Sequence, residues 1–307
     1  MFKDKVVLIS GGSGTLGQAM TSFLLKSKVK KVIVYSRGEM LQYEMQNKFK
    51  SDKIRYFIGD VRDKERLYRA MVGVDYVVHA AALKQVPACE YNPIEAVKTN
   101  ILGAMNVIDA AIDNGVKKVI ALSTDKAVNP INLYGATKLC SDKLFIQANA
   151  YSGNKGTSFA VVRYGNVAKS RGSVIPFFKS LHENGCKELP VTHEDMTRFY
   201  ITIEQGVELI AKAFKESKGG EIFVAKIPSF KITDLVNSMG CSYEIVGIRP
   251  GEKLHEIMIT VDDVARVFEQ KDCYIIYPEG YTHKRKGKHV EPNFYYSSDI
   301  NNQWLYK

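Results

Sequence analysis

The stretch Val6-Val7-Leu8-Ile9, followed closely by Gly11-Gly12-Ser13-Gly14-Thr15-Leu16-Gly17, decides the fold of this chain. The apolar run predicts a buried strand. Glycines at positions 11, 14 and 17 allow a tight turn, a close approach to a pyrophosphate, and a helix packed against the strand. That helix, expected from about Gln18 to Lys26, would point its amino end at the phosphates. These features predict a dinucleotide site formed by Gly11, Ser13, Gly14, Thr15, Leu16 and Gly17.

Short apolar segments alternate with helical patterns over the first half of the chain. Helical periodicity runs from Ile94 to Asn114. The further expected strands are Val32–Tyr35, Ile54–Ile58, Tyr76–His79, Val119–Leu122 and Phe159–Arg163. Such alternation predicts an α/β fold with a Rossmann-like, doubly wound parallel sheet.

The regular alternation of strand and helix patterns ends after Asn166. Ser170–Pro176 and Leu189–Thr192 are expected to form loops and short strands, Glu204–Glu216 a helix, and Glu221–Val224 is a candidate for a further strand of the sheet. We therefore predict a cofactor-binding domain over residues 1–165 and about 200–225. A smaller, interleaved substrate-binding lobe would occupy about 166–199 and 226–307.

The end of the second strand bears on the choice of cofactor. A fold of this kind that selects NAD carries an acid about 20 residues after the glycines, where it binds the ribose 2′-hydroxyl. This chain has Ser36-Arg37 instead, a hydroxyl and a guanidinium that suit a 2′-phosphate. Glu39 is the competing acid, but it lies past the expected strand end. The sequence thus favours NADP.

Two more strand ends supply candidates for cofactor binding. Gly59-Asp60-Val61 and Ala80-Ala81-Ala82 stand at the edge where an open α/β sheet binds ligands. Asp60 suits a hydrogen bond to an adenine amine, or a cap on the next helix, and the alanines allow close approach of the nicotinamide ribose. His79 is expected to be a core histidine, because no partner stands at metal-ligand spacing. Lys84 is a site candidate, with a solvated loop lysine as the alternative.

The chemistry-bearing residues follow the fifth strand, in Ser123-Thr124-Asp125-Lys126 and then Tyr134-Gly135-Ala136-Thr137-Lys138. Asn132 would cap a helix here, and Tyr134 and Lys138, four residues apart, share one helical face. A lysine beside a tyrosine favours the phenolate, which makes Tyr134 a candidate base for a sugar hydroxyl. The acid–base pair Asp125 and Lys126 at the same strand end strengthens this interpretation over an ordinary turn and a solvated helix.

The composition of the chain indicates which kinds of ligand and which cellular compartment to expect. The 307 residues are 45% hydrophobic, as in an ordinary globular protein. The formal charge of +10 suits an anionic ligand, with a solvated surface or a nucleic-acid partner as the alternatives. Five scattered cysteines without a C-x-x-C pair predict neither a metal site nor disulfides, and favour a reducing compartment. Without a signal peptide or a span of about 20 apolar residues, we expect a cytoplasmic protein with no membrane partner. The basic run His283–His289 lacks interleaved aromatic residues, so we expect a solvated loop and no nucleic-acid partner.

The sequence resembles the extended short-chain dehydrogenase/reductase family, and within it the inverting UDP-N-acetylglucosamine 4,6-dehydratases that open bacterial pseudaminic acid biosynthesis. The resemblance covers nearly the whole chain, and the triplet Thr124-Asp125-Lys126 is specific within the larger family. The matching stretches are Tyr35–Arg37, Gly59–Asp63, Glu90–Pro93, Lys98–Asn100, Ser123–Lys138, Arg163–Val167, Met196–Phe199 and Arg249–Glu256.

The resemblance implies an NADP-dependent hydro-lyase. Tyr134 and Lys138 would remove the proton of the sugar C4 hydroxyl, with Thr124 hydrogen-bonded to it and NADP as the hydride acceptor. Lys126 would then take the C5 proton while Asp125 protonates the departing C6 hydroxyl. The acid must be partly protonated and the amine partly neutral, so both pKa values should be perturbed.

The resemblance also implies ligand contacts and an assembly. Val61, Lys84, Thr99, Tyr134 and Lys138 would contact the cofactor. The substrate UDP-N-acetylglucosamine would contact Lys84, Asn166, Val174, Thr192, Arg198, Arg249 and Glu252. Family members form homo-oligomers, so we expect one built from dimers, with a hexamer as one form.

Some positions separate subfamilies. Retaining dehydratases and capsule-type inverting relatives usually carry Met where this chain has Tyr134, which favours the pseudaminate branch. Gln85 and Lys169 replace a usual histidine and a usual glycine near the substrate, and the tail after Trp304 is short. The alternatives are a retaining dehydratase, a UDP-sugar 4-epimerase that uses the same tyrosine, and a non-catalytic NADP-sensing protein.

Overall fold

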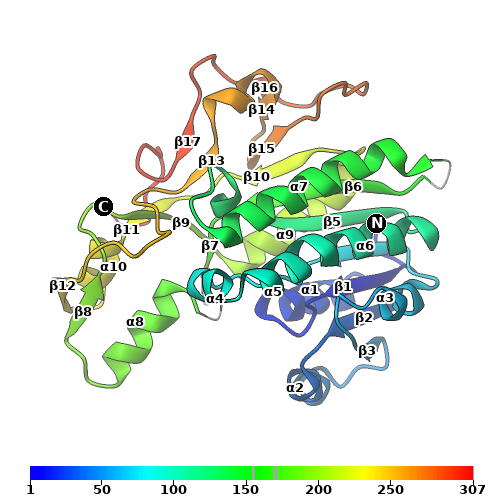
Figure 1. Cartoon of the computed structure of the whole chain (residues 1–307), viewed down its shortest axis with the longest axis horizontal. Coiled ribbons are helices and arrows are strands. Elements are labelled where there is room, and N and C mark those ends of the chain that lie inside the picture. The colour runs from blue at the N-terminus through cyan, green and yellow to red at the C-terminus, as the bar shows by residue number, and fades with distance from the viewer. Residues whose placement is uncertain (154–155, 169, 171, 307) are drawn as a thin grey trace.

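A parallel sheet runs through the centre of the computed structural model, which describes residues 1–153, 156–168, 170 and 172–306 (Figure 1). Its parallel strands are β1 (Val6–Ser10), β2 (Lys31–Ser36), β3 (Ile54–Ile58), β4 (Tyr76–His79), β5 (Lys118–Thr124), β6 (Ser158–Tyr164) and β10 (Ile222–Ala225). They lie in the order β10-β6-β5-β4-β1-β2-β3. The order reverses beside β1, so the predicted α/β fold with a doubly wound parallel sheet is confirmed. β10 starts one residue later than the predicted strand.

Helices cover both faces of this sheet. They are α1 (Thr15–Lys26), α2 (Glu39–Phe49), α3 (Lys64–Met71), α4 (Val86–Tyr91), α5 (Pro93–Val97), α6 (Gly103–Asp113), α7 (Leu133–Tyr151) and α9 (Ile203–Glu216). Helix α1 packs against α9, whereas α6 packs against both α3 and α7. Apolar side chains from the strands and from both sets of helices form one large core. Among the described residues, no helix has the length and apolar character needed to cross a membrane.

The predicted helix from Ile94 to Asn114 is interrupted in its middle. Between α5 and α6 the chain forms a π-helical turn, η1 (Lys98–Leu102). Such turns are frequent at functional sites. Here the turn holds Asn100, whose amide donates to the Leu83 carbonyl at 2.9 Å and to Thr137 Oγ1 at 3.0 Å. The turn therefore fixes the loop after β4 against helix α7.

The smaller lobe is built from segments on either side of α9. Its elements are β7 (Asn166–Val167), α8 (Val174–Glu183), β8 (Glu188–Val191), β9 (Thr197–Ile201), β11 (Ser229–Lys231), α10 (Ile232–Ser238) and β12 (Ser242–Ile245). Phe178, Leu189 and Phe230 belong to a separate apolar core in this lobe. The prediction of loops and short strands over Ser170–Pro176 is wrong from Val174 onward, where α8 begins. Pro176 lies in the first turn of α8, where a missing amide proton costs nothing.

The C-terminal segment returns to the large sheet. Strands β14 (Val267–Glu269), β15 (Cys273–Ile276) and β16 (Lys288–His289) extend it beyond β10 with antiparallel pairing. A 3₁₀ turn, η4 (Val261–Arg266), precedes them, and β13 (Ile257–Ile259) pairs with β17 (Tyr296–Ser297). The division of the chain into two domains stays a prediction.

The basic run His283–His289 is exposed, as predicted for a solvated loop, but it is also anchored. Its last two residues pair with β14. The Arg285 guanidinium lies 5.5 Å from the centre of the Phe268 ring.

Helix α7 starts so close to the end of β5 that one position must be glycine. A Cβ on Gly135 would overlap the Lys126 carbonyl oxygen and lie 3.0 Å from Pro130 Cβ. We expect Gly135→Ala to destabilise the protein by about 1–3 kcal/mol, as overpacking does. Urea unfolding measures the change, and an unaltered midpoint would contradict the close packing.

Gly206→Ala is the matched control. Its added methyl group would meet Leu16 Cδ1 at an ordinary 3.7 Å inside helix α9. Replacing a helical glycine by alanine without a clash should stabilise the protein by about 0.5–1 kcal/mol. The two glycine substitutions are therefore expected to shift the unfolding midpoint in opposite directions.

Candidate active site

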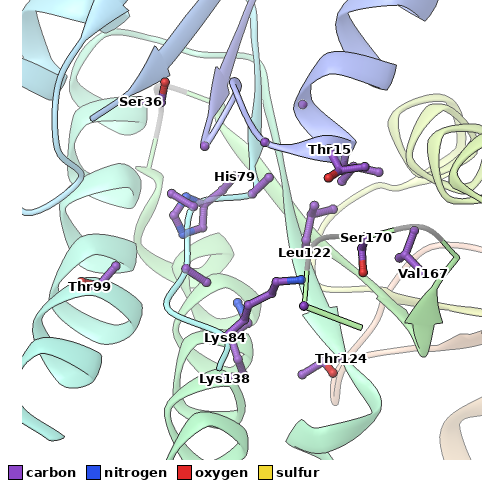
Figure 2. Close-up of a pocket in the computed structure, with 18 of the residues that line it drawn as sticks. Thr15, Ser36, His79, Lys84, Thr99, Leu122, Thr124, Lys138, Val167 and Ser170 are labelled. Atoms are coloured by element: carbon purple, nitrogen blue, oxygen red, sulfur yellow. The ribbon is translucent and has the colours of Figure 1, made fainter. Parts of the chain in front are cut away.

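One cavity of about 590 Å³ opens at the carboxyl ends of the parallel strands. Figure 2 shows it with Ser36 toward one end and Thr124 toward the other. Every residue predicted to bind the cofactor, and every residue predicted to act in catalysis, lines it. These are Gly11, Ser13–Gly17, Ser36, Arg37, Asp60, Val61, Ala80–Ala82, Lys84, Thr99, Thr124–Lys126, Tyr134 and Lys138. The structure thus places the predicted cofactor-binding residues and the predicted catalytic residues around the same cavity.

The turn between β1 and α1 has the shape of a phosphate cradle. Gly11 has a φ of +69°, and a Cβ there would lie 2.9 Å from the Ala81 amide nitrogen. A Cβ on Gly17 would lie 2.5 Å from Gly12 Cα. Gly14 precedes α1 without a side-chain cap, which leaves the first amides of the helix for an anion. These residues fit the pyrophosphate of a dinucleotide.

A hydroxyl and a guanidinium line the far end of the cavity. Ser36 Oγ accepts a hydrogen bond from Gln42 Nε2 at 2.9 Å. The Arg37 side chain is 54% exposed, and its Nη1 lies 3.8 Å from Asp60 Oδ2. Glu39 starts α2 with an exposed side chain and is not among the lining residues. This end therefore presents a hydroxyl and a guanidinium to the cavity, with the Asp60 carboxylate beside the guanidinium.

Asp60 holds a turn rather than a helix. Its carboxylate accepts hydrogen bonds from Arg62 N at 3.0 Å and Arg62 Nε at 2.9 Å. Burial alone would raise the pKa of Asp60, but the hydrogen bonds and charges of Arg62 and Arg37 lower it. The residue that caps α3 is Asp63, which accepts from Arg66 N at 2.9 Å. The capping role expected of Asp60 is wrong, and its contact with adenine stays a prediction.

Two buried polar residues flank the cavity near its middle. His79 is 1% exposed and lies 2.8 Å from Ser10 Oγ through its Nδ1. Burial, with help from the Lys138 charge, lowers the pKa of His79 to about 3, so it is the neutral core histidine that the sequence predicts. The Thr99 hydroxyl is buried without a hydrogen-bond partner among the described residues. An unsatisfied hydroxyl beside a cavity fits a ligand contact.

Tyr134 and Lys138 come from the first turns of α7. Asn132 caps this helix, as predicted, by accepting a hydrogen bond from Gly135 N at 2.8 Å. Burial lowers the pKa of Lys138, and the nearby Asp142 carboxylate offsets part of that effect.

The environment of Tyr134 differs from the expected one. Burial raises the pKa of Tyr134 to about 12, although the Lys126 charge and a hydrogen bond with Thr124 act to lower it. A nearby lysine does favour the phenolate, as the sequence predicts, but that lysine is Lys126, and desolvation outweighs its charge in the free protein.

Lys126 lies between two carboxylates. Its Nζ is 3.1 Å from Asp125 Oδ1 and 2.8 Å from Glu256 Oε1. Burial alone would lower the pKa of Lys126, but the charges of Asp125 and Glu256 raise it well above the usual range. The expected partly neutral amine is therefore wrong for the free protein. Burial raises the pKa of Asp125, and the Glu256 charge adds to the rise while Lys126 opposes it, which agrees with an acid.

A second buried ion pair supports the catalytic helix from behind. Asp142, one turn after Lys138, accepts a hydrogen bond from Ser123 Oγ at 2.5 Å and lies 3.5 Å from Arg163 Nη2. Arg163 Nη1 donates to the Met258 carbonyl at 2.9 Å. These contacts tie α7, β6 and β13 together. The i, i+4 spacing from Lys138 is the sequence signal by which Asp142 could have been found.

The predicted substrate contacts fall into two groups. Lys84 and Asn166 line the cavity; Val174, Thr192, Arg198, Arg249 and Glu252 do not. Burial lowers the pKa of Lys84, and the Lys126 charge adds to this effect.

The outer group includes an ion-paired cluster. Glu252 lies 3.3 Å from Arg198 Nη2 and 3.1 Å from Arg249 Nε, so it bridges the two arginines. Thr192 donates to the Met196 sulfur at 3.0 Å. Val174 is the first residue of α8.

Two positions depart from the resembling family, and the structure places one of them. Gln85 lines the cavity, and its side chain packs against Gly172, where a Cβ would overlap the Gln85 amide. Lys169 lies outside the described residues.

Glu256 is the functional candidate that sequence reasoning missed. It stands at the end of the quoted stretch Arg249–Glu256, but a single glutamate before a short strand carries no periodic or motif signal of its own. Its contact with Lys126 joins residues that are far apart in the sequence.

Comparisons with known proteins show the family of this chain. A family model described as polysaccharide biosynthesis protein matches residues 7–278. The UDP-N-acetylglucosamine 4,6-dehydratase (inverting) of Campylobacter jejuni subsp. jejuni strain 81-176 is 55% identical, over 99% of this chain and 95% of that protein. A UDP-glucose 4-epimerase of Rickettsia massiliae is 43% identical, over 91% of this chain and 85% of that protein. The X-ray structure of Pen from Bacillus thuringiensis matches with a TM-score of 0.93 and 42% identity, over 99% of this chain and 94% of that chain. The chain therefore belongs to the polysaccharide biosynthesis protein family.

Proposed function

We propose that this chain is a UDP-N-acetylglucosamine 4,6-dehydratase, a hydro-lyase that inverts the configuration at C5 of the sugar. The observation that carries the proposal is the acid–base pair Asp125 and Lys126, which opens into the same cavity as Tyr134 and the phosphate cradle. An epimerase needs only the tyrosine and the dinucleotide, whereas elimination of water also needs a base at C5 and an acid at C6. The 55% identity to the Campylobacter jejuni enzyme supports this choice.

The first step is oxidation at C4. Tyr134 takes the proton of the C4 hydroxyl, and Thr124 hydrogen-bonds the same oxygen. NADP, when bound, supplies the hydride acceptor. Because burial holds the pKa of Tyr134 at about 12, the cations that face it decide how readily it loses its proton, and Lys126 is one that this chain provides.

The second step is loss of water across C5 and C6. A proton moves from Lys126 Nζ to Asp125 Oδ1 over 3.1 Å, which gives a neutral amine and a carboxylic acid. The amine then takes the C5 proton, and the acid protonates the C6 oxygen as it leaves as water. Lys126 returns to the ammonium form and Asp125 to the carboxylate. The pair thus transfers one proton without a net change in its own charge.

The ligand contacts complete the proposal. Ser36 and Arg37 bind the 2′-phosphate of NADP, and Lys84 lies between cofactor and substrate. Asn166, Val174 and Thr192 face the nucleotide sugar, while Arg198, Arg249 and Glu252 hold its diphosphate and ribose. The arginines suit bidentate binding of phosphate oxygens.

The proposed setting is the first step of pseudaminic acid biosynthesis in the cytoplasm, carried out by a homo-oligomer. Free thiols at all the cysteines are compatible with a reducing compartment. Large apolar side chains on α4–α6 support self-association, since Tyr91 is 87% and Ile94 66% exposed.

The cofactor assignment predicts a preference for NADP that Arg37 creates. Arg37→Asp should cost about 1.5–3 kcal/mol of NADP binding, because it removes a hydrogen bond to a charged group. Isothermal titration calorimetry with NADP and NAD measures the effect. Arg69→Asp makes the same charge change on α3, away from the cavity, and should leave the preference intact. Equal binding of NAD and NADP by the unaltered protein would refute the assignment.

The proposed roles predict which step of the reaction each variant loses. Tyr134→Phe should block oxidation, so that no reduced cofactor absorbance develops with substrate. Asp125→Asn and Lys126→Ala should abolish dehydration while NADP binding stays close to normal. Turnover of UDP-N-acetylglucosamine by Lys126→Ala at nearly the original rate would mean that another group removes the C5 proton.

The stereochemical prediction tests the function itself. Elimination leaves a planar 4-keto-5,6-ene, and hydride returns to C6, so the configuration at C5 depends on which face receives the proton. If Tyr134 or a water held by it protonates the face opposite the original hydrogen, the product is the L-arabino 4-keto sugar. Early turnover in deuterium oxide, followed by proton NMR, should show deuterium at C5 in the inverted configuration.

Other products would identify the alternatives. A first-formed D-xylo 4-keto sugar would indicate a retaining dehydratase. UDP-N-acetylgalactosamine would indicate a 4-epimerase, and absence of product would indicate a non-catalytic protein.

A further inference from the structure

Glu256 has the features of a functional carboxylate that the roles assigned so far leave unused. It is 1% exposed and contacts Lys126 Nζ at 2.8 Å, a shorter distance than the 3.1 Å between Lys126 and Asp125. Its second oxygen, Oε2, is buried and has no hydrogen-bond partner in the described part of the chain. Burying a carboxylate is costly unless partners offset the cost, so its position needs an explanation.

The backbone around Glu256 is fixed from the C-terminal segment. Glu256 N donates to Ser298 Oγ at 2.9 Å, and Ser298 N donates to the Glu256 carbonyl at 2.8 Å. Ser298 Oγ also lies 2.7 Å from Thr197 Oγ1 on β9. These hydrogen bonds to Ser298 hold the backbone of Glu256 in place, and this backbone positions the carboxylate beside Lys126.

Arg198 is the more distant of the two cations that pair with Glu256. Its Nε lies 3.8 Å from Glu256 Oε1, beyond hydrogen-bond distance. Arg198 already donates to the Thr197 carbonyl at 2.7 Å and to the Leu254 carbonyl at 3.1 Å, and it pairs with Glu252. The short contact of Glu256 is the one with Lys126.

We infer that Glu256 is a positioning residue of the elimination step, which holds Lys126 Nζ beside Asp125 and keeps the amine protonated until its proton passes to Asp125. The inference deepens the proposed function and rests on it. The charged and titratable groups that face Lys126 are Asp125 on the same turn, Glu256 before β13, Arg198 on β9, Tyr134 on α7 and Lys84 after β4. Lys253 also acts on Glu256.

Removing the negative charge of Glu256 has a definite sign. A negative charge raises the pKa of any group beside it, and Glu256 does so for both Lys126 and Asp125. The working form of the pair carries one shared proton. Its loss limits activity at high pH, and a second proton limits activity at low pH. Glu256→Gln should therefore move both limits of the kcat profile to lower pH, by about one unit or more.

Chemical labelling tests the inference without substrate or cofactor. Only a neutral amine reacts with acetic anhydride, and mass spectrometry gives the rate at Lys126 relative to the exposed Lys50. At pH 9, Glu256→Gln should raise this ratio about tenfold or more, since one pKa unit is tenfold in neutral amine. An unchanged ratio would overturn the inference, whatever the enzyme makes.

Kinetics separate charge from position. Glu256→Asp keeps the charge but withdraws it by one methylene, so dehydration should slow while the pH limits move less than in Glu256→Gln. Reduced cofactor should still form with substrate in both variants, because oxidation does not use Glu256. A dehydration rate and pH profile equal to those of the unaltered protein in both variants would overturn the inference.

Glu221→Gln is the matched control. Glu221 is also 1% exposed and accepts hydrogen bonds from Lys218 N and Gly219 N, away from the cavity. Its loss should lower stability and leave both the labelling ratio and the pH limits unchanged. A shift of equal size in Glu221→Gln would reduce Glu256 to a structural role. If the unaltered protein makes no 4-keto sugar, the proposed function and the link to elimination fail, while the labelling result still reports on the contact.

Discussion

A cation that is largely withdrawn from water needs carboxylates beside it, and Lys126, whose side chain is 24% exposed, imposes this constraint on the whole site. The carboxylates come from the end of β5 and from the residue before β13, with Arg198 on β9 as the second cation. The two carboxylates and these two cations balance one another in formal charge. The balance exists only when the smaller lobe and the C-terminal segment fold over the edge of the sheet, so the catalytic pair depends on the complete fold and not on its own strand.

Long-range contacts of Arg163 connect the groups proposed for oxidation with those proposed for elimination. Asp142 on α7 and Met258 on β13 both bind Arg163, which lies 5% exposed in β6. Tyr134 and Lys138 lie on the same helix as Asp142, and Glu256 lies two residues before Met258, so Arg163 connects both groups. Oxidation at C4 and proton removal at C5 concern neighbouring atoms of one sugar. A shared rigid support keeps the groups for both steps in fixed relation.

The parts of this molecule that sequence could predict are those set by local patterns. The run from Val6 to Gly17 carries its strand, turn and helix in consecutive residues, and Tyr134 and Lys138 share a face by spacing alone. Helix α8 was missed because Pro176 favours a break when it is read without its position in the first turn. Glu256 was missed because its partner, Lys126, lies 130 positions earlier in the sequence. The pKa shifts of Tyr134 and Lys126 depend on burial, and that of Lys126 depends also on this distant carboxylate; no local pattern contains either cause.

Burial also explains why an acid and a base stand next to each other in this site. In a dry cavity, gaining or losing a proton changes a charge and carries a desolvation cost. A proton that moves from Lys126 to Asp125 turns an ion pair into a neutral pair, so the net charge of the cavity stays the same. Glu256 opposes this shift through Lys126 and favours it through Asp125, because its charge raises both pKa values. In the proposed elimination, Lys126, Asp125 and the sugar can therefore exchange the proton among themselves while the charge of the pair stays the same.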